Sequence, residues 1–356
     1  MAEKVLVAMS GGVDSSVAAY LLQQQGYACI GVTMRLYENE TAGIPRGHTC
    51  CSLDDVEDAR AVAYDLGMPY YVLNFTEEFD EKVIRKFVQV YQNGGTPNPC
   101  IDCNRYLKFD HLLNRARELG CDYIATGHYV QRWQDENGRW GLRKNDDPGK
   151  DQSYVLYSLT QDQLAHTLFP LGGMHKDAVR AIAEEQGLCN ARKHDSQDIC
   201  FVPDGDYASF IRSFTGRDYP RGEFVDKSGN VLGEHRGLID YTVGQRKGLG
   251  IALGEPKYVT ALMPKENRVV LGSNEDLMGR ELDAKNFNFI AFDTPPAEFR
   301  ASARVRYRQA EQPATVRVTG ENTVHITFDE PQRAITKGQA VVVYDGDVVI
   351  GGGEIC

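Results

Sequence analysis

Two cysteines stand one helical turn apart in the stretch NPCIDCN, where they are Cys100 and Cys103. Thiols at this spacing can form a disulfide, bind a metal or carry sulfur. The chain has nine cysteines, which are too dilute and too irregularly spaced for the disulfide framework of a secreted protein. The pair therefore indicates thiol or metal chemistry. The nine lie at positions 29, 50, 51, 100, 103, 121, 189, 200 and 356.

A second stretch able to do chemistry is the glycine-rich turn SGGVDSS, from Ser10 to Ser16. It follows a short apolar run and precedes a helical pattern, so its backbone N–H groups and the helix dipole suit an anion such as a phosphate. It lacks the Gly-Lys-Ser/Thr ending of a Walker A loop and the glycine spacing of a dinucleotide fold. A plain strand-to-helix turn would explain one glycine and one serine, but not the whole set. The stretch resembles the pyrophosphatase loop of enzymes that cleave ATP between its α and β phosphates, with Asp14 on the magnesium or pyrophosphate side.

Alternating strands and helices must position these residues. Such alternation predicts an α/β domain with a doubly wound, mostly parallel sheet, whose ligands bind at the carboxyl ends of the strands. The predicted strands are Val5–Met9, Cys29–Leu36, Tyr70–Phe75 and Asp122–Thr126, and the predicted helices are Ser15–Gln25, Asp54–Leu66, Glu77–Gln92 and Arg105–Leu119.

The pattern changes beyond about Tyr207. After a last helix, Asp206–Phe214, short strands broken by Gly, Pro, Asn and Asp predict a small β-barrel or sandwich. The stretch Gly237–Gly254 is the richest in glycine and is predicted to be a functional or connecting loop. The predicted strands are Val259–Leu271, Phe287–Phe292, Ala301–Tyr307, Thr315–Val318, Thr323–Phe328 and Ala340–Tyr344.

Composition sets wider limits. A chain of 356 residues, 42% hydrophobic, is long enough for two or three domains. No segment has the roughly 20 consecutive apolar residues of a membrane span, so a cytoplasmic protein is expected. The net charge of −11 argues against a surface coated with non-specific nucleic-acid contacts, although a local basic surface fits the same total.

A set of motifs in a defined order resembles the tRNA-uridine 2-sulfurtransferases, also called tRNA-specific 2-thiouridylases. Each motif is weak alone, but together they cover nearly the whole chain. The resemblance implies a pyrophosphatase-loop catalytic domain over residues 1–206, a small central α+β domain over 207–275 and a C-terminal β-barrel over 276–356. Besides the Ser10–Ser16 loop, the motifs are TPNP from Thr96, CN at Cys103, KF at Lys108, ATGHY from Ala125, KDQSY from Lys150, DS at Asp195, ICF from Ile199 and RYR from Arg306.

The resemblance implies a reaction and a nucleotide site. Members of this family replace the C2 oxygen of the wobble uridine by sulfur in tRNAs for glutamate, glutamine and lysine, after ATP has adenylated that oxygen with Mg²⁺ present. The nucleotide contacts carried over are Ala8, Met9, Ser10, Gly11, Gly12, Val13, Asp14, Ser15, Met34 and Gly127.

Sulfur chemistry is carried over to two cysteines. Cys200 matches the position of the persulfide, and Cys103 matches the cysteine that attacks it and releases sulfur towards C2. A Cys103–Cys200 disulfide would remain for a reductant to reset. The sulfur comes from a donor or persulfide carrier protein, or from free sulfide.

The chain departs from the usual family pattern at Cys100, where an aspartate is common. Cys100, Cys103 and Cys200 together offer three thiolates, a set suited to a [4Fe–4S] cluster with one open iron that presents hydrosulfide. The alternative is a persulfide pair with Cys100 as a bystander. We favour the cluster, because three thiols that converge on one ATP site are an unfavourable arrangement unless they bind a ligand.

Several positions match tRNA contacts of the family. Arg304, Arg306 and Arg308 alternate along a predicted strand, which would place a cationic stripe on one face; a solvated row of edge charges is the alternative. His128 has the alternative of a structural histidine at a strand end. The matching positions are Asn98, Pro99, Cys100, His128, Lys150, Asp151, Gln152, Arg306, Tyr307, Arg308 and Gln339.

The remaining cysteines and the rival functions complete the expectations. Cys50-Cys51 fits a sulfur relay, alternative ligands or a small buried pair, of which we favour the buried pair, while Cys29, Cys121 and Cys189 are predicted to be packing residues. Rival functions are an ATP-dependent amide or carbon–nitrogen ligase with the same loop, and a nucleotide-binding module without catalysis. A monomer is the expected state.

Overall fold

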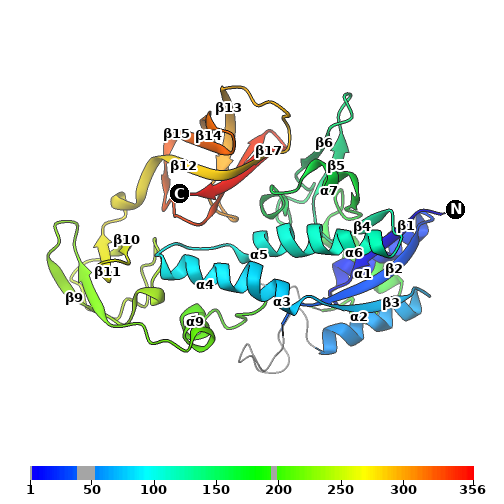
Figure 1. Ribbon diagram of the computed structural model, residues 1–356, viewed down its shortest axis with the longest axis horizontal. Helices are drawn as coiled ribbons and strands as arrows, with labels where there is room; N and C mark the ends of the chain where they lie inside the picture. The colour runs from blue at the N-terminus through cyan, green and yellow to red at the C-terminus, as the bar shows by residue number, and fades with distance from the viewer. Residues whose placement is uncertain (1, 38–52, 194–198) are drawn as a thin grey trace. The chain divides into compact units, whose positions relative to one another are not determined.

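The computed structural model describes residues 2–37, 53–193 and 199–356 of the chain (Figure 1). Two compact units can be distinguished within the chain. The first comprises residues 1–83, 100–205 and 347–350, and the second comprises residues 84–99, 206–346 and 351–356.

A five-stranded parallel sheet forms the centre of the first unit. Its strand order is β3-β2-β1-β4-β7, and each neighbouring pair of strands in it is parallel. Because the chain moves outward from β1 in one direction and continues at β4 in the other, the order reverses between β1 and β4. This is the doubly wound arrangement that the alternating pattern predicts. The strands are β1 Lys4–Ala8, β2 Ala28–Arg35, β3 Tyr70–Asn74, β4 Tyr123–Ala125 and β7 Thr167–Leu168.

Helices pack against this sheet. α1 begins after Gly12 and buries Val17, Ala18 and Leu22 in a core that it shares with β1 and with α2 and α8. The chain leaves α1 through Gly26, whose φ of +90° lies in the left-handed region that glycine adopts at low cost. The helices of this unit are α1 Val13–Gln24, α2 Leu53–Asp65, α3 Thr76–Phe79, α5 Pro99–Asp102, α6 Leu112–Glu118, α7 Gln161–Ala165 and α8 Lys176–Glu185.

One long helix differs from its prediction. The stretch with Cys100 and Cys103 was expected to be a loop before a helix at Arg105, but the helix already begins at Pro99. A proline is favoured in the first helical position, where its missing N–H needs no partner. α5 continues through a π-helical segment, Cys103–His111, into α6. The two cysteines therefore lie in the first turns of a helix.

A hairpin that the sequence reading did not anticipate follows β4. Its strands are β5 Gln131–Gln134 and β6 Trp140–Arg143. The guanidinium carbon of Arg132 lies 4.1 Å from the centre of the Trp140 ring, and that of Arg143 lies 4.5 Å from the centre of the Trp133 ring. These cation–π contacts brace both faces of a short hairpin.

The second unit contains a four-stranded sheet with the order β10-β11-β8-β9. The single strand predicted over Val259–Leu271 is wrong, because the segment turns at Pro264–Asn267 and forms the antiparallel pair β10 and β11. Phe224, Tyr241 and Leu249 lie in the core beneath this sheet. The elements are α4 Arg85–Gln92, α9 Tyr207–Thr215, β8 Gly222–Val225, β9 Val231–His235, β10 Tyr258–Met263 and β11 Arg268–Gly272.

A closed barrel completes the second unit. Six strands pair in the order β12-β15-β14-β13-β16-β17, and β17 pairs back with β12. A C-terminal β-barrel was predicted, and the observed barrel confirms the expected fold class. Its strands are β12 Met278–Phe289, β13 Glu298–Arg304, β14 Gln312–Gly320, β15 Thr323–Arg333, β16 Ala340–Asp345 and β17 Val348–Ile355.

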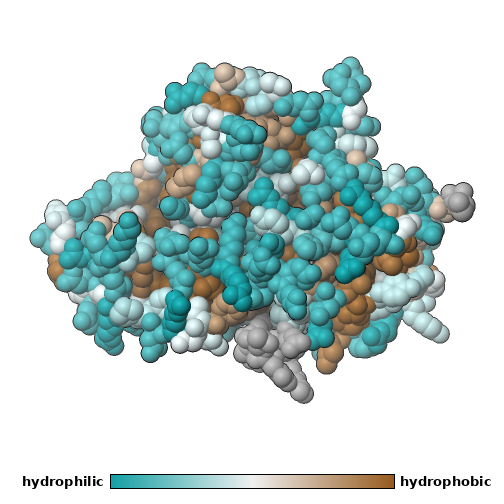
Figure 2. All heavy atoms as spheres, in the orientation of Figure 1, coloured by the Kyte–Doolittle hydropathy of each residue, from teal (hydrophilic) through white to brown (hydrophobic). Residues whose placement is uncertain are grey.

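The surface agrees with the composition. Figure 2 shows a face covered mostly by hydrophilic residues, with apolar residues in smaller patches between them. In the part of the chain that the structure describes, no helix is both long and apolar enough to cross a membrane.

Candidate active site

The glycine-rich loop lies where the strand order reverses. β1 leads into Ser10–Ser16, and the neighbouring strand β4 leads into Gly127. A Cβ on Gly127 would lie 2.8 Å from the carbonyl carbon of Asp14 and 2.8 Å from the amide nitrogen of Ser15. Only glycine allows this approach. The two predicted nucleotide-binding segments are therefore in contact at the switch point, where doubly wound sheets bind ligands.

Serine hydroxyls shape the loop from inside. Ser15 Oγ donates to the Gly12 carbonyl at 3.0 Å and accepts from the Ser10 amide at 3.2 Å. Ser16 Oγ donates to the same Gly12 carbonyl at 3.2 Å. Gly11 has φ +74°, and its α-carbon packs on the backbone of Asp55 so closely that a side chain would collide. The loop is thus held in one conformation at the N-terminus of α1, which suits an anion.

Asp14, in the first turn of α1, has two side-chain donors. Lys176 Nζ donates to Asp14 Oδ1 at 2.7 Å and to Oδ2 at 2.9 Å, and the Tyr129 hydroxyl donates to Oδ1 at 2.6 Å. The Lys176 side chain is 8% exposed and that of Asp14 is 30% exposed. A magnesium ion on Asp14 would have to compete with this ammonium for both carboxylate oxygens.

Lys176 was missed in the sequence reading, although it carries a signal. It is the first residue of α8, and a cation at a helix N-terminus opposes the helix dipole. Such a placement is unfavourable unless a partner requires it. Tyr129 was quoted as part of the ATGHY motif without a role, and the structure gives it one as the second donor to Asp14.

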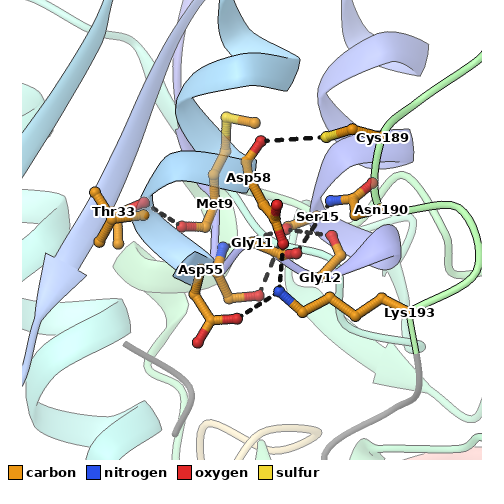
Figure 3. A network of polar contacts seen from close by, with 12 residues as sticks. Met9, Gly11, Gly12, Ser15, Thr33, Asp55, Asp58, Cys189, Asn190 and Lys193 are labelled. Carbon is orange, nitrogen blue, oxygen red and sulfur yellow. Dashed lines mark hydrogen bonds and ion pairs between the residues drawn. The ribbon is translucent and has the colours of Figure 1, made fainter. Parts of the chain in front are cut away.

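A polar network fixes the loop from the side of α2 (Figure 3). Asn190 Nδ2 donates to the Gly11 carbonyl at 3.1 Å and to Ser16 Oγ at 2.8 Å. Lys193 Nζ donates to Asp55 Oδ1 at 2.6 Å and to Asp58 Oδ2 at 2.5 Å, so it ties the segment after α8 to α2. Neither Asn190 nor Lys193 was singled out from sequence, because both follow α8 in a segment without a recognisable motif.

The Lys150–Gln152 segment supports the site through the backbone of Tyr129. Gln152 Oε1 accepts the Tyr129 amide at 2.9 Å, and the Gln152 amide donates to the Tyr129 carbonyl at 3.0 Å. Asp151 is buried and accepts from the Ser153 amide and hydroxyl at 3.1 and 2.8 Å. Gln152 therefore holds the backbone of the residue that donates to Asp14. The predicted tRNA contacts of this segment stay predictions.

His128 lies inside the protein, with 8% exposure. Its Nδ1 is 2.8 Å from Thr126 Oγ1, and its ring packs beside Phe109 and Phe169 at centroid distances of 5.7 and 6.4 Å. Burial lowers the pKa of His128 well below its usual value, and the charge of Lys108 acts in the same direction. This geometry matches the alternative prediction, that His128 is a structural histidine at a strand end. The predicted contact of His128 with tRNA stays a prediction.

The three cysteines of interest occupy different environments. Cys100 is exposed, Cys103 is buried and Cys200 is partly buried. The Tyr37 hydroxyl donates to the Cys200 carbonyl at 2.9 Å, and the adjacent Phe201 packs edge-on against Phe79 at 5.6 Å. These contacts fix the backbone at Cys200. Among the described residues, no three His, Cys, Asp or Glu side chains are arranged to hold a metal ion. Because Cys100, Cys103 and Cys200 do not form such a group, the structure does not favour the cluster over the persulfide pair.

The other cysteines differ in how far they are buried. Cys29 and Cys121 are buried as expected, and burial raises the pKa of the Cys29 thiol to about 11. The expectation for Cys189 is wrong, since it is exposed; its Sγ lies 3.8 Å from the Asp58 carbonyl. Cys50 and Cys51 lie outside the described residues, as do Asp195 and Ser196.

Gln339, a predicted tRNA contact, lies against the backbone that precedes two further predicted contacts, Asn98 and Pro99, within the second unit. Gln339 Nε2 donates to the Thr96 carbonyl at 2.9 Å and to the Pro97 carbonyl at 3.3 Å. It thereby holds the backbone that leads into Asn98, which is half-buried, and Pro99, which is buried. Their roles towards tRNA stay predictions.

The predicted arginine stripe is wrong. β13 ends at Arg304, and the chain then turns, so Arg306 and Arg308 do not continue the strand. Arg304 Nη2 donates to the Tyr344 hydroxyl at 2.7 Å. Arg306 Nη2 donates to the carbonyls of Val243 and Ala334, both at 3.2 Å, and to Thr336 Oγ1 at 3.0 Å. Tyr307 and Arg308, at the turn, are exposed.

Known families match all three regions of the chain. The family described as the tRNA methyl transferase HUP domain matches residues 3–204, and its PRC-barrel domain matches residues 208–273. The family described as the aminomethyltransferase β-barrel domain matches residues 279–355. Fold and site thus define a HUP-domain protein with two C-terminal β domains.

Curated relatives narrow this class. The tRNA-specific 2-thiouridylase MnmA of Clostridioides difficile is 54% identical over 356 residues, which cover 100% of this chain and 98% of the relative. The protein of the same name from Moorella thermoacetica is 54% identical over 351 residues, 98% of each chain. The chain belongs to the family of tRNA-specific 2-thiouridylases. The resemblance drawn from the motifs is confirmed.

Solved structures are more distant. The U34-tRNA thiolase NcsA from Methanococcus maripaludis, solved with its [4Fe-4S] cluster, is 19% identical with a TM-score of 0.35, over 60% of this chain and 70% of that one. A 4-thiouridine synthetase in complex with RNA and ATP is 18% identical with a TM-score of 0.36, over 61% and 54% of the two chains.

Proposed function

We propose that this protein catalyses the ATP-dependent replacement of the C2 oxygen by sulfur in the wobble uridine of tRNAs for glutamate, glutamine and lysine, in the cytoplasm. The observation that carries the proposal is the contact between Gly127 and the Asp14–Ser15 backbone. It joins the two segments that are predicted to bind the nucleotide, at the switch point of the sheet and the N-terminus of α1. The full-length match to the thiouridylase family supports the choice of substrate.

Adenylation is the first step. A uridine carbonyl oxygen is a poor leaving group, so it must first be converted into a better one. The C2 oxygen attacks the α phosphorus of ATP, the bond to the β-phosphate oxygen breaks, and pyrophosphate leaves with that electron pair. The N3 proton is released to water. The loop amides at the start of α1 are placed to bind the phosphates, and magnesium would arrive bound to the nucleotide.

Sulfur transfer is the second step. The Cys103 thiolate attacks the Sγ atom of a persulfide on Cys200 and expels hydrosulfide, which leaves a Cys103–Cys200 disulfide. Hydrosulfide attacks C2, AMP leaves with the oxygen, and N3 regains its proton. A thiol reductant then reduces the disulfide, and a persulfide carrier protein or sulfide with an oxidant reloads Cys200. The fixed backbone at Cys200 supports this role, because a nucleophile needs a defined position.

The test is thiolation of a tRNA transcript with ATP, Mg²⁺ and a persulfide donor, followed by separation of thiolated from unmodified tRNA and by AMP measurement. We expect Cys103→Ser and Cys200→Ser to lower 2-thiouridine formation by roughly 100-fold or more, the scale of removing a catalytic group, while pyrophosphate release continues. Cys356→Ser, at an exposed cysteine, is the matched control. Full thiolation by Cys103→Ser would remove Cys103 from the sulfur-transfer step, whereas a wild-type protein that forms AMP without thiolating tRNA would favour the rival amide or carbon–nitrogen ligase.

The choice between persulfide and cluster needs its own measurement. Anaerobically purified protein is assayed for iron, acid-labile sulfide and zinc, together with Cys100→Ala. We expect protein without stoichiometric metal, in which Cys100→Ala still thiolates. About four irons and four sulfides per chain, lost together with activity in Cys100→Ala, would establish the three-cysteine cluster and reject the persulfide cycle.

A further inference from the structure

The feature that the proposed function leaves unexplained is the ammonium of Lys176. It is almost completely buried and lies between the two oxygens of Asp14, at 2.7 and 2.9 Å. It also lies 5.8 Å from the centre of the Tyr129 ring, so an aromatic face covers it on one side. Burial of a lysine is costly, and the first position of α8 adds an unfavourable interaction with the helix dipole.

The position of Lys176 depends on Asp14, whereas the position of Asp14 does not depend on Lys176. Asp14 sits in the first turn of α1, where a carboxylate is favoured by the helix dipole, and it accepts a further hydrogen bond from Tyr129. It would be stable there without a lysine. Lys176 has the opposite situation, since its charge is disfavoured at its own helix. We conclude that Asp14 and Tyr129 hold Lys176 in place, rather than the reverse.

The held ammonium lies beside the predicted phosphate cradle. Asp14 stands between Gly12 and Ser15 in the same loop, and its backbone is in contact with Gly127. A cation fixed at this position in a water-poor site acts on charge that develops on a phosphate oxygen much more strongly than a solvated lysine would.

We propose that Lys176 is a catalytic residue of the adenylation step, which contacts the β or γ phosphate of ATP and stabilises the charge that develops on the leaving pyrophosphate. The inference rests on the proposed function. As the bond between the α phosphorus and the bridging oxygen breaks, its electron pair moves onto the pyrophosphate, and the ammonium neutralises it without transferring a proton. Asp14 is then a positioning residue on the pyrophosphate side, which is one of the two roles that the sequence predicts for it.

The experiment measures chemistry and binding separately in the full-length protein. Pyrophosphate release is followed by rapid quench with ATP, Mg²⁺ and a tRNA transcript, and nucleotide affinity is measured by calorimetry with α,β-methylene-ATP. We expect Lys176→Met to lower the rate of pyrophosphate release by about 100- to 1,000-fold, as for loss of one preorganised donor, and to weaken analogue binding by less than tenfold. Lys176→Arg keeps the charge and should recover part of the rate.

A purely structural ion pair must give a different result. Lys176→Met alone leaves the Asp14 charge without its partner, so we pair it with Asp14→Asn, which makes both members neutral. If the pair only stabilises the fold, the double variant regains both thermal stability and pyrophosphate release, which would overturn the proposal. We expect it to regain stability but stay inactive. Lys257→Met removes a partly buried lysine outside the glycine-rich loop, paired with Glu255 at 2.6 Å, and should have at most a tenfold effect on rate.

Failure of the proposed function would look different again. If the wild-type protein releases no pyrophosphate when tRNA is added, both the function and the assignment of Lys176 fall. If the wild-type protein is active and Lys176→Met keeps at least a third of its rate, the thiolation function stands and only the assignment of Lys176 falls.

Discussion

At the scale of single residues, the site depends on side chains whose environment changes their chemistry. Gly127 has no side chain because the Asp14 backbone occupies that space, and both carboxylate oxygens of Asp14 accept hydrogen bonds from the Lys176 side chain. His128 shows the opposite effect: its ring is buried beside Phe109 and Phe169, and this surrounding favours the neutral form. Each residue type is common, and only its partners make it functional or structural.

The neutral state of His128 gives a prediction about pH. Because the pKa of His128 is lowered in the folded protein, the unfolded chain binds a proton that the folded chain does not, once the pH falls below about 6.5. The free energy of unfolding should therefore be at its full value above pH 7 and fall on acidification, by up to about 1.4 kcal/mol per pH unit from this residue.

Urea unfolding at pH 8, 7, 6 and 5 measures this contribution. We expect His128→Gln to flatten the pH dependence, and His175→Gln, whose side chain is 66% exposed in the wild type, to leave it as it is. Identical pH dependence in His128→Gln and the wild type would contradict a buried neutral histidine.

At the scale of elements, the site is assembled from the ends of neighbouring strands. β1 and β4 pair in parallel, so the loops that follow them emerge at the same edge of the sheet. The N-terminus of α8 supplies Lys176, which Asp14 holds, and the segment after α8 supplies Asn190, which donates to the Gly11 carbonyl and to Ser16 Oγ. The loop conformation is therefore a property of four elements and not of its own seven residues.

The close packing between the two loops can be tested with one methyl group. Gly127→Ala places a Cβ 2.8 Å from the Asp14 and Ser15 backbone, so the glycine-rich loop must move. We expect at least a tenfold loss of affinity for ATP and a similar or larger loss of pyrophosphate release, since a displacement of about 1 Å at a reacting centre costs on the order of 100-fold in rate.

Gly173→Ala is the matched control, because its Cβ would meet no atom closer than 3.6 Å. Calorimetric titration with ATP analogue compares the two variants. Wild-type affinity in Gly127→Ala would show that the loop accommodates the methyl group and that the close approach is not required for nucleotide binding.

At the scale of the whole molecule, three regions with different folds share one chain, and within the second unit a side chain connects two of them. Within the second unit, Arg306 of the barrel donates to the Val243 carbonyl, which belongs to the stretch before β10, and to Ala334 and Thr336 of the barrel itself. Its guanidinium therefore joins the barrel to the region that precedes it. This is a structural use of a residue that the family resemblance places at the tRNA.

Replacement of Arg306 separates these two uses. Arg306→Met removes hydrogen bonds to two carbonyls and a hydroxyl, and we expect it to lower the free energy of unfolding by about 1 to 3 kcal/mol. The KM for tRNA should rise less than threefold at a temperature where the variant is folded. The matched control is Arg317→Met, at an exposed position of β14. A large rise in KM without loss of stability would return Arg306 to direct tRNA contact.

The fold class and the position of the glycine-rich loop could be predicted from local sequence patterns. Alternating apolar runs and helical patterns are local signals, because burial on one face of a strand or helix imposes a period of 2 or 3.6 residues. The loop SGGVDSS was recognisable because its glycines, aspartate and serines stand together between an apolar run and a helical pattern. Local signals were weaker where packing overrides them. β17 contains Gly351, Gly352 and Gly353, which are unfavourable in strands. The Phe287 ring and the backbone of Lys285 and Asn288 in β12 occupy the space that side chains at Gly351 and Gly353 would need.

Which charged side chains meet could not be predicted from local patterns, because it depends on how the elements pack in three dimensions. Lys176 and Asp14 are 162 residues apart in the chain, and no local pattern links them. The same holds for Asn190 at the loop carbonyl, for Tyr129 at Asp14 and for Arg306 at Val243. A hydrogen bond or ion pair between distant segments depends on the packing of whole elements, because a shift of one residue along a strand or helix turns a side chain to another face. The residue types in the site were therefore visible in the sequence, whereas their partners were fixed by the sheet and the helices that bring them together.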